Sequence, residues 1–531
     1  MLLGIFYFPF ILVGLIGYLL VPFFLEYLKE VIAFGSLTTF LFGIFLLVPK
    51  KGKPIFLLCF GFILSLLGFI KLSFYQLYGV KLSASALFVI FETNANEATE
   101  FLENYMSVPI FLLAILFALP LVGALFIIKK RKGILQSINP YAQSWTRKVV
   151  ILVVITGCGT LISWKFKNEN ILLNSYGSYK EYVQTKEILN SKFAKEENPV
   201  VADATSANEE EVFVVVMGES TSRWHMQLYG YDRKTNPALT EKKDELWVFD
   251  SIIVPHVHTI LSLEKVLTLS RFEDPAPAEN ASVVQLANAA GFETYWISNQ
   301  QPVGVFESLS TVIGNASQNK SFVATEGYKY TIHDETLLPV LDQVLAEKSR
   351  KKMIFVHLIG THVGYEKRYP KSFAYFSGKS RPDKSEKANE YINAYDNAVR
   401  YNDFIVNTII EKVEALQTKS YVAYFSDHGD DVYDIAEVAG HNEYLATRPM
   451  YEVPFLVWFS EKYKEGSPLF SKKEQIIQRR YNLEDFIYSF AEMSEIRFQK
   501  MDSTRSLFND GFQKRTRWIK DGINYDEPKK N

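Results

Sequence analysis

Two short apolar runs in the chain each end in side chains that can bind a metal ion. The run at residues 212–217 leads to Glu219, and the run at residues 421–425 leads to Asp427 and His428. Runs rich in β-branched and aromatic residues and closed by glycine predict buried parallel strands, and open α/β sheets carry their chemistry at the carboxyl ends of such strands. Two carboxylates and an imidazole at one sheet edge suit a borderline divalent cation such as zinc, with a position left open for a nucleophile or substrate.

A hydroxyl that could act as the nucleophile follows in the same part of the chain. Thr259 lies in the segment Pro-His-Val-His-Thr-Ile-Leu-Ser-Leu-Glu, and apolar residues with helical spacing come after it. We therefore expect Thr259 to be the N-cap of a helix, where free N–H groups and the helix dipole favour negative charge. That environment would suit a metal-activated alkoxide and the phosphate that it attacks.

The elements that must position these residues are predicted to form an α/β domain. From residue 211 onward, strand and helix patterns alternate, which indicates βαβ units and a mainly parallel sheet between helices. The expected strands are 211–217, 293–298, 353–359, 421–425 and 453–459, and the expected helices lie around 259–270, 282–290, 336–348, 384–415 and 483–493.

The first part of the chain differs in composition, because it holds stretches long enough to cross a hydrocarbon core of about 30 Å. A chain of 531 residues exceeds one ordinary core, so at least two domains are expected. The predicted spans lie near 3–25, 31–48, 54–72, 108–128 and 148–165.

The orientation of these spans follows from their basic loops. Lys and Arg gather between spans two and three and between spans four and five, so both loops should be cytoplasmic. We expect a five-helix transmembrane domain at 1–165 with an outer interfacial segment at 73–107, then an amphipathic helix and exposed linker at 166–210. The segment 211–531 is then the exported catalytic domain, in which the role of residues 505–531 stays open.

Charge and cysteine content exclude some classes of function. The formal net charge is −2, and the exported part shows no long basic stripe, so a nucleic-acid partner is not expected. The two cysteines, Cys59 and Cys158, both fall in predicted spans, so the exported domain should have no disulfides.

Several motifs together resemble the membrane-bound phosphoethanolamine transferases of Gram-negative envelopes, which belong to the sulfatase and alkaline phosphatase superfamily. They are Gly-Glu-Ser-Thr-x-Arg at 218–223, Leu-Tyr-Gly-Tyr-Asp-Arg-x-Thr at 228–235, His-Thr-Ile at 258–260, Trp-Ile-Ser-Asn-Gln-Gln at 296–301 and Ser-Asp-His-Gly at 426–429. The resemblance implies that Glu219, Thr259, Asp427 and His428 are zinc ligands. It also implies that Thr259 carries a phosphoethanolamine intermediate.

The resemblance assigns further residues to substrate binding. His362 and His441 correspond to histidines near the transferred group, with catalytic and substrate-binding roles. Glu92, Thr93 and Glu97 correspond to a donor motif for the ethanolamine headgroup, although Val89 stands where some members have Asn. The absence of disulfides, together with the Gly-Glu-Ser-Thr and His-Thr-Ile motifs, favours a resemblance to the branch that modifies the lipopolysaccharide core.

Plainer interpretations remain open for each residue. Asp427 and His428 could form a strand-end turn, and Thr259 could be an ordinary helix cap. His362 and His441 could be surface-loop residues. The acidic donor motif could be a solvated helix face.

The predicted function is transfer of phosphoethanolamine from phosphatidylethanolamine to a lipopolysaccharide acceptor, on core sugar or lipid A, with release of diacylglycerol. One tightly bound zinc ion is expected, with room for a second, in a monomeric multi-pass protein of the bacterial inner membrane whose carboxyl-terminal domain is periplasmic. The alternatives are phosphoglycerol or another headgroup transfer on the same scaffold, and a non-catalytic membrane sensor or scaffold.

Overall fold

The chain forms two compact units. The computed structural model describes residues 2–21, 24–78, 106–130, 144–167, 169–207, 209–274, 279–300, 309–324, 332–443 and 445–527. One unit comprises Met1–Phe91 and Ala95–Val183, and the other comprises Glu92–Asn94 and Gln184–Asn531. The predicted donor residues Glu92, Thr93 and Glu97 lie outside the described residues.

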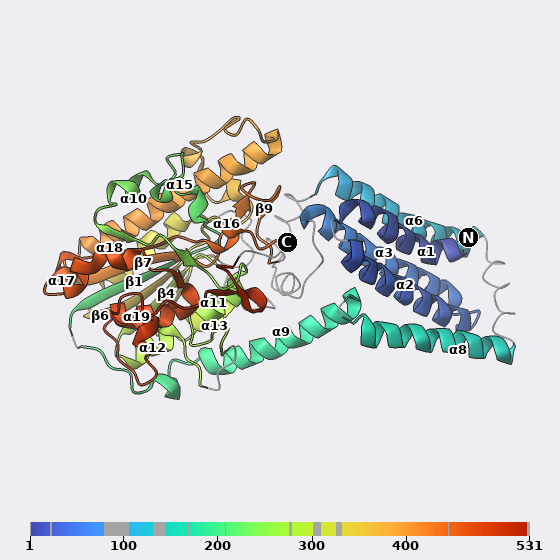
Figure 1. Ribbon diagram of the computed structural model, residues 1–531, viewed down its shortest axis with the longest axis horizontal. Coiled ribbons are helices and arrows are strands. Elements are labelled where there is room, and N and C mark those ends of the chain that lie inside the picture. Colours follow the sequence, from blue (N-terminus) through green and yellow to red (C-terminus); the bar gives the residue numbers. More distant parts are fainter. Residues whose placement is uncertain are drawn as a thin grey trace. The chain divides into compact units, whose positions relative to one another are not determined.

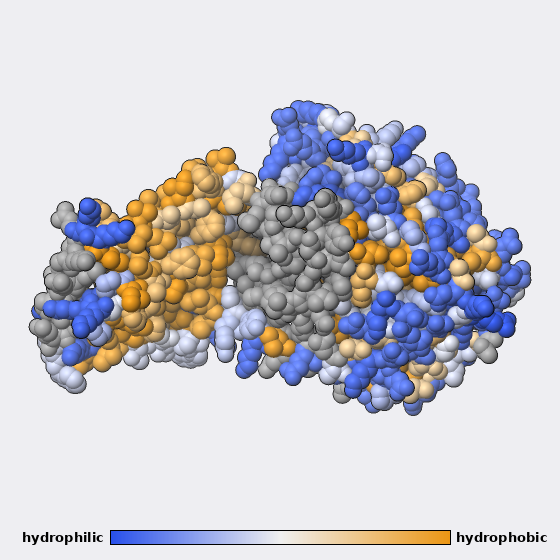
Figure 2. Space-filling model, turned by 180° about the vertical axis from the view of Figure 1, so that it is seen from behind, coloured by the Kyte–Doolittle hydropathy of each residue, from blue (hydrophilic) through white to orange (hydrophobic). Residues whose placement is uncertain are grey.

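The first unit contains five helices long and apolar enough to cross a membrane, counted over the described residues. Figure 2 shows apolar residues over most of its visible face, as a lipid-facing surface requires. The five predicted spans are confirmed as helices, with shifts of a few residues at most ends. The helices are α1 (Leu2–Leu20), α2 (Phe24–Leu47), α3 (Lys53–Tyr78), α6 (Val108–Lys130) and α8 (Trp145–Thr160), which continues as a π-helical turn over Leu161–Lys165.

The predicted break between the first two spans, at residues 26–30, is wrong, because Lys29 and Glu30 lie inside α2. Glu30 is buried, forms an ion pair with Lys71 of α3 and accepts a 2.6 Å hydrogen bond from the hydroxyl of Tyr75. A carboxylate is tolerated among apolar helices only when its charge and lone pairs are matched in this way. The pairing therefore explains why a charged residue does not end the helix.

The segment predicted as an exposed linker is partly buried in the second unit. It follows helix α9 (Ile171–Phe193), whose last residue Phe193 is fully buried in the core of that unit, and Val201 of the segment is fully buried there too. The side chain of Asn198 donates to Gln285, and Thr205 forms an isolated bridge to Arg497. A few buried apolar side chains thus hold in place a polar stretch that its composition predicts to be exposed.

The second unit is built on a seven-stranded sheet in the order β2-β10-β7-β1-β6-β4-β5. All neighbouring pairs are parallel except those of β10, which runs antiparallel to β7 and β2. The five predicted strands are present, whereas the two edge strands were missed because they are short. The strands are β1 (Glu211–Gly218), β2 (Leu246–Val248), β4 (Glu293–Ser298), β5 (Asn319–Phe322), β6 (Lys351–His357), β7 (Lys419–Ser426) and β10 (Phe455–Phe459).

Helices cover both faces of this sheet, which gives the expected α/β/α architecture (Figure 1). Alternate residues of β1 enter two hydrophobic cores: Phe213 and Val215 face one core, and Val212 and Val214 face the other. One core packs against α11 (Thr259–Val266), α12 (Val283–Ala289) and α19 (Phe486–Met493), and the other against α14 (Leu338–Ala346) and α15 (Glu386–Glu414).

The register of the two central strands decides where the candidate ligands emerge. Strands β1 and β7 are neighbours, and Gly218 pairs with Ser426 at the last position of each. Glu219 and Asp427 therefore leave the sheet at the same point of its carboxyl edge, where ligands of open α/β sheets bind. The core on either side keeps both strand ends fixed.

Candidate active site

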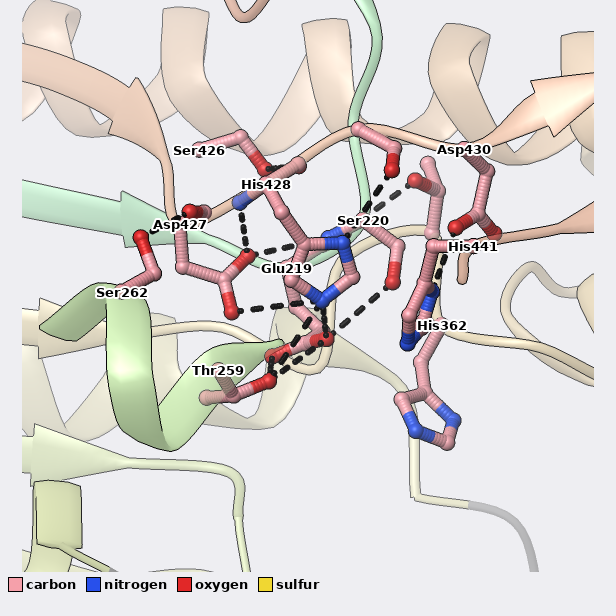
Figure 3. Close-up of polar contacts among 12 residues, drawn as sticks. Glu219, Ser220, Thr259, Ser262, His362, Ser426, Asp427, His428, Asp430 and His441 are labelled. Atoms are coloured by element: carbon pink, nitrogen blue, oxygen red, sulfur yellow. Dashed lines mark hydrogen bonds and ion pairs between the residues drawn. The ribbon is translucent and has the colours of Figure 1, made fainter. Parts of the chain in front are cut away.

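Three of the four predicted ligands converge on one buried point at this edge. Glu219, Asp427 and His428 each offer a ligand atom, and these atoms lie within 4.8 Å of one another. The Nε2 atom of His428 is 3.1 Å from Glu219 Oε1 and 3.6 Å from Asp427 Oδ2. All three side chains are at most 2% exposed (Figure 3).

Thr259 completes the group. Its hydroxyl donates to both oxygens of Glu219, at 3.2 and 3.1 Å, and lies 3.5 Å from His428 Nε2. The predicted N-cap is displaced by one residue, because His258 is the N-cap and Thr259 is the first residue of α11. The Thr259 hydroxyl is consequently turned to the cluster and makes no capping bond with its own helix.

Backbone contacts hold the loops that carry the ligands. Ser220 adopts a left-handed conformation with φ 60°, and its N–H donates to Asp427 Oδ1 at 3.1 Å. Ser262 of α11 donates to the carbonyl oxygen of Asp427 at 2.5 Å, which ties the helix that begins at Thr259 to the loop that carries Asp427. At Gly360 a Cβ atom would come 2.7 Å from the backbone of Glu219, so only glycine permits this close approach.

Burial and close charged neighbours shift the pKa values of all three side chains in the cluster. Burial opposes ionisation of Glu219, but hydrogen bonding and the charge of His428 hold its pKa well below the usual range. Burial, followed by the charge of Glu219, raises the pKa of Asp427 well above its usual range. Burial opposes protonation of His428, but the carboxylate of Asp427 and then Glu219 raise its pKa to about 10. A positive charge between the two carboxylates would therefore stabilise their ionised forms.

The donor set fits a bound cation. Asp427 Oδ1 accepts from two backbone N–H groups, whereas Oδ2 is buried without a hydrogen-bond partner among the described residues. Its contact with His428 Nε2, at 3.6 Å, is too long for a hydrogen bond, so this buried oxygen can accept a closer positive partner. Two carboxylates, one imidazole and one hydroxyl are ligands that zinc accepts in four-coordinate sites.

Two further predicted residues lie next to this cluster. The ring of His441 is 4.1 Å from that of His428, and its Nδ1 is 2.7 Å from Asp430 Oδ1. His428, Asp430 and His441 form a second group with metal-binding geometry. His362 is half-buried and follows β6 on the same side of the cluster (Figure 3).

Several residues at the site were given no role by sequence reasoning. Gln300, just after β4, donates to Glu219 Oε2 at 3.3 Å and to the carbonyl of Leu358 at 3.1 Å. Asp430 orients His441, and only its place after Ser-Asp-His-Gly could have suggested it. His258 is buried with neither ring nitrogen hydrogen-bonded to a described residue, and its ring is 5.2 Å from that of His441.

Comparisons with known proteins agree with this geometry. The Sulfatase family model matches residues 211–496. The phosphoethanolamine transferase EptC of Escherichia coli K12 is 32% identical over 518 residues, which cover 93% of this chain and 88% of the relative.

Solved structures extend the likeness to the fold. The carboxyl-terminal periplasmic domain of Escherichia coli EptC in complex with Zn is 32% identical, with a TM-score of 0.58 over 62% of this chain and 95% of that one. The integral membrane protein EptA of Neisseria meningitidis, a lipooligosaccharide phosphoethanolamine transferase, matches 94% of this chain and 95% of its own with a TM-score of 0.66. At 18% identity it shows the fold alone. The chain therefore belongs to the phosphoethanolamine transferase family, a group of membrane enzymes with a sulfatase-like domain.

Proposed function

We propose that the protein transfers phosphoethanolamine from phosphatidylethanolamine to a lipopolysaccharide acceptor, on a core sugar or on lipid A, through a covalent intermediate on Thr259. The observation that carries this proposal is the position of the Thr259 hydroxyl. It donates to both oxygens of Glu219 inside a buried cluster whose Asp427 Oδ2 lacks a hydrogen-bond partner among the described residues. A hydroxyl directed at a metal-binding carboxylate is placed to lose its proton and attack phosphorus.

In the first half-reaction, Thr259 Oγ1 attacks the phosphorus of the donor headgroup. Zinc held by Glu219, Thr259, Asp427 and His428 would lower the cost of ionising the hydroxyl and screen the incoming phosphate. The Oγ1–P bond forms and the bond from phosphorus to the glycerol oxygen breaks. The leaving diacylglycerol oxygen takes a proton, for which His441 or His362 is the candidate acid.

In the second half-reaction, an acceptor hydroxyl or phosphate attacks the phosphoethanolamine ester and Thr259 Oγ1 leaves. The same histidines then accept the acceptor's proton or hydrogen-bond to the phosphoryl oxygens. The contact between His441 and Asp430, at 2.7 Å, fixes the ring so that its other nitrogen can face the substrate. The group His428, Asp430 and His441 would be the place for a second cation.

The membrane unit would keep enzyme and donor in one thin layer, which raises their effective concentration. We take residues 1–165 as the transmembrane domain, 166–210 as the connection and 211–531 as the catalytic domain of a monomer. The catalytic domain would face the periplasm from the inner membrane. Glu92, Thr93 and Glu97 would bind the ammonium group of the donor at the outer surface.

Phosphoglycerol transfer is the main competing reaction, because it uses the same nucleophile. The full-length protein in detergent should be incubated separately with phosphatidylethanolamine and phosphatidylglycerol, digested, and examined by mass spectrometry. We expect the peptide containing Thr259 to gain the mass of phosphoethanolamine only. The Thr259→Ala variant should gain nothing, and Thr259→Ser, which keeps a hydroxyl, should retain some labelling. A phosphoglycerol adduct, or labelling that survives in Thr259→Ala, would contradict the proposal.

A further inference from the structure

A polar cleft lined in part by Arg223 and Trp224, a few residues after Glu219, is not used by the mechanism above. It is a cleft of about 390 Å³ in the second unit. Part of its wall comes from the Leu-Tyr-Gly-Tyr-Asp-Arg motif, to which the transfer chemistry assigns no task. Its lining includes Arg223, Trp224, Tyr229, Tyr231, Asp232 and Arg448, with Glu452 among them.

Three side chains of the lining are held in place by one buried carboxylate. Glu452 is 3% exposed, and its Oε2 accepts from Arg223 Nε and Trp224 Nε1, both at 2.9 Å. Its Oε1 accepts from Arg448 Nε at 2.8 Å and from the hydroxyl of Tyr525 at 2.5 Å. Side chains fixed by so many charge-assisted bonds lose little freedom when a ligand binds, so the cleft is preorganised.

The outer surface of the cleft offers chemistry suited to a sugar that carries a negative charge. The side chain of Arg448 is 62% exposed and that of Asp232 is 72% exposed. Asp232 pairs with Arg381 at 3.8 Å, so the two arginines around Glu452 leave one unmatched positive charge beside the rings of Trp224 and Tyr229. Guanidinium groups bind phosphate, carboxylates accept from hydroxyls, and aromatic rings cover the apolar face of a pyranose. Acyl chains would find too few aliphatic side chains here.

Three segments connect this cleft to the candidate metal ligands. Arg223 is four residues after Glu219, so their Cα atoms are at most about 14 Å apart, since an extended chain covers about 3.5 Å per residue. The carbonyl of Met450, in helix α16 (Arg448–Tyr451), accepts from Gly429 N, next to His428, at 2.9 Å. Ile253, six residues before Thr259, bridges to Glu452. A glycan of a few sugars can span this separation.

We propose that this cleft binds a sugar with an anionic substituent, such as phosphate, in the acceptor glycan, while another group of the same glycan reaches Thr259. The proposal rests on the proposed function, because it names where the acceptor of that reaction is held. Arg448 is the residue that contacts the anionic group, and Trp224 is the residue that packs on the ring. Neither touches the phosphoryl group in transit.

The test separates the two half-reactions. The full-length protein is first loaded with phosphatidylethanolamine, and discharge of the Thr259 adduct is then followed against the concentration of core oligosaccharide released from lipopolysaccharide. Arg448→Ala and Trp224→Ala are compared with Arg350→Ala. Arg350 is a control because its side chain is 79% exposed. It precedes β6, so it lies at the amino ends of the parallel strands, whereas the candidate ligands lie at their carboxyl ends.

We expect both cleft variants to need at least about tenfold more oligosaccharide than the control for half-maximal discharge, because Arg448→Ala loses a charge-assisted contact and Trp224→Ala loses a ring contact. Removing the phosphates of the oligosaccharide should weaken the control protein but barely change Arg448→Ala. Equal half-saturation in all three variants would overturn the proposal. So would a loss of adduct formation as large as the loss of discharge, because the cleft would then act on the first step.

Failure of the proposed function would give a different experimental result from failure of the cleft proposal. If no adduct forms on Thr259 in the unmodified protein, the covalent mechanism is wrong, but binding to the cleft can still be measured. In the Thr259→Ala background, calorimetry with the same oligosaccharide should show about tenfold weaker binding when Arg448→Ala is added. Unchanged affinity for the oligosaccharide would refute its binding in the cleft, whatever the outcome for the covalent mechanism.

Discussion

Two of the buried clusters of histidine and carboxylate in the second unit differ in whether their polar atoms are matched. His225 places Nδ1 2.6 Å from Asp396 and Nε2 3.0 Å from Asp434. The remaining oxygen of Asp396 accepts from Tyr231 at 3.0 Å and Arg233 at 2.5 Å. In the cluster of His428, by contrast, Asp427 Oδ2 is buried with no hydrogen-bond partner among the described residues.

This contrast suggests that the cluster of His225 serves the stability of the fold and that the cluster of His428 serves the reaction. A fully satisfied network contributes to the stability and uniqueness of the fold, because breaking it leaves a buried charge alone. A cluster with an unmatched oxygen stores unfavourable energy that a cation or substrate can relieve. Substitutions in the first cluster should therefore change stability, and substitutions in the second should change activity.

Asp427→Asn should have the largest effect, and that effect should be on activity. Neutralising this ligand removes charge from the metal site, so we expect transfer to fall at least about 10³-fold, as for loss of a major electrostatic group. Thermal unfolding of the metal-free protein should not be lowered, because the substitution also relieves repulsion from Glu219. Retained activity, or a large drop in the metal-free unfolding temperature, would break the distinction between the clusters.

Asp396→Asn should show the reverse pattern. The substitution removes the carboxylate that pairs with Arg233 and leaves His225 with Asp434 alone, which should lower the free energy of unfolding by about 3 to 5 kcal/mol. Thermal and chemical unfolding of the full chain in detergent can measure this. Exposed Asp342→Asn on helix α14 is a matched control, since its side chain is 54% exposed where it pairs with Lys412. Equal stability of the two variants would contradict the structural role of the cluster.

The cluster of His225 should also make stability depend on pH, with a smaller effect. Burial opposes its charge, but Asp434 and then Asp396 raise the pKa of His225 to about 10. The unfolded histidine titrates near about 6.5, so its stabilising contribution is complete below that pH and is lost as the pH rises towards 10. The unfolding temperature should therefore fall between pH 7 and 10 more steeply in the unmodified protein than in His225→Gln. Parallel curves would show that His225 is not charged in the folded state.

Sequence patterns were enough to predict the part of the site that lies on strand ends. Val212 to Met217 and Tyr421 to Phe425 are buried parallel strands, so Glu219 and Asp427 were expected at the same sheet edge, and they meet because the two strands are neighbours. Membrane helices were also predictable, because their apolar stretches are long and continuous. Their ends were less well predicted, as for α3, which continues to Tyr78.

Contacts between segments distant in the chain could not be predicted. Gln300 reaches Glu219, and Glu452 gathers Arg223, Trp224 and Arg448, because of how loops fold over the sheet edge. Local composition also misplaced the segment around Val201, since a few docked side chains outweigh many polar ones. The displaced N-cap at Thr259 reflects the usual uncertainty of one residue in a helix boundary.

The metal content of the purified full-length protein tests the central claim most directly. Zinc should be counted by elemental analysis in the unmodified protein, in Asp427→Asn and in His225→Gln, after the same dialysis. The account predicts about one tightly held zinc ion per chain in the unmodified protein and in His225→Gln, and almost none in Asp427→Asn. An active unmodified protein without stoichiometric metal, or equal zinc in all three proteins, would contradict it.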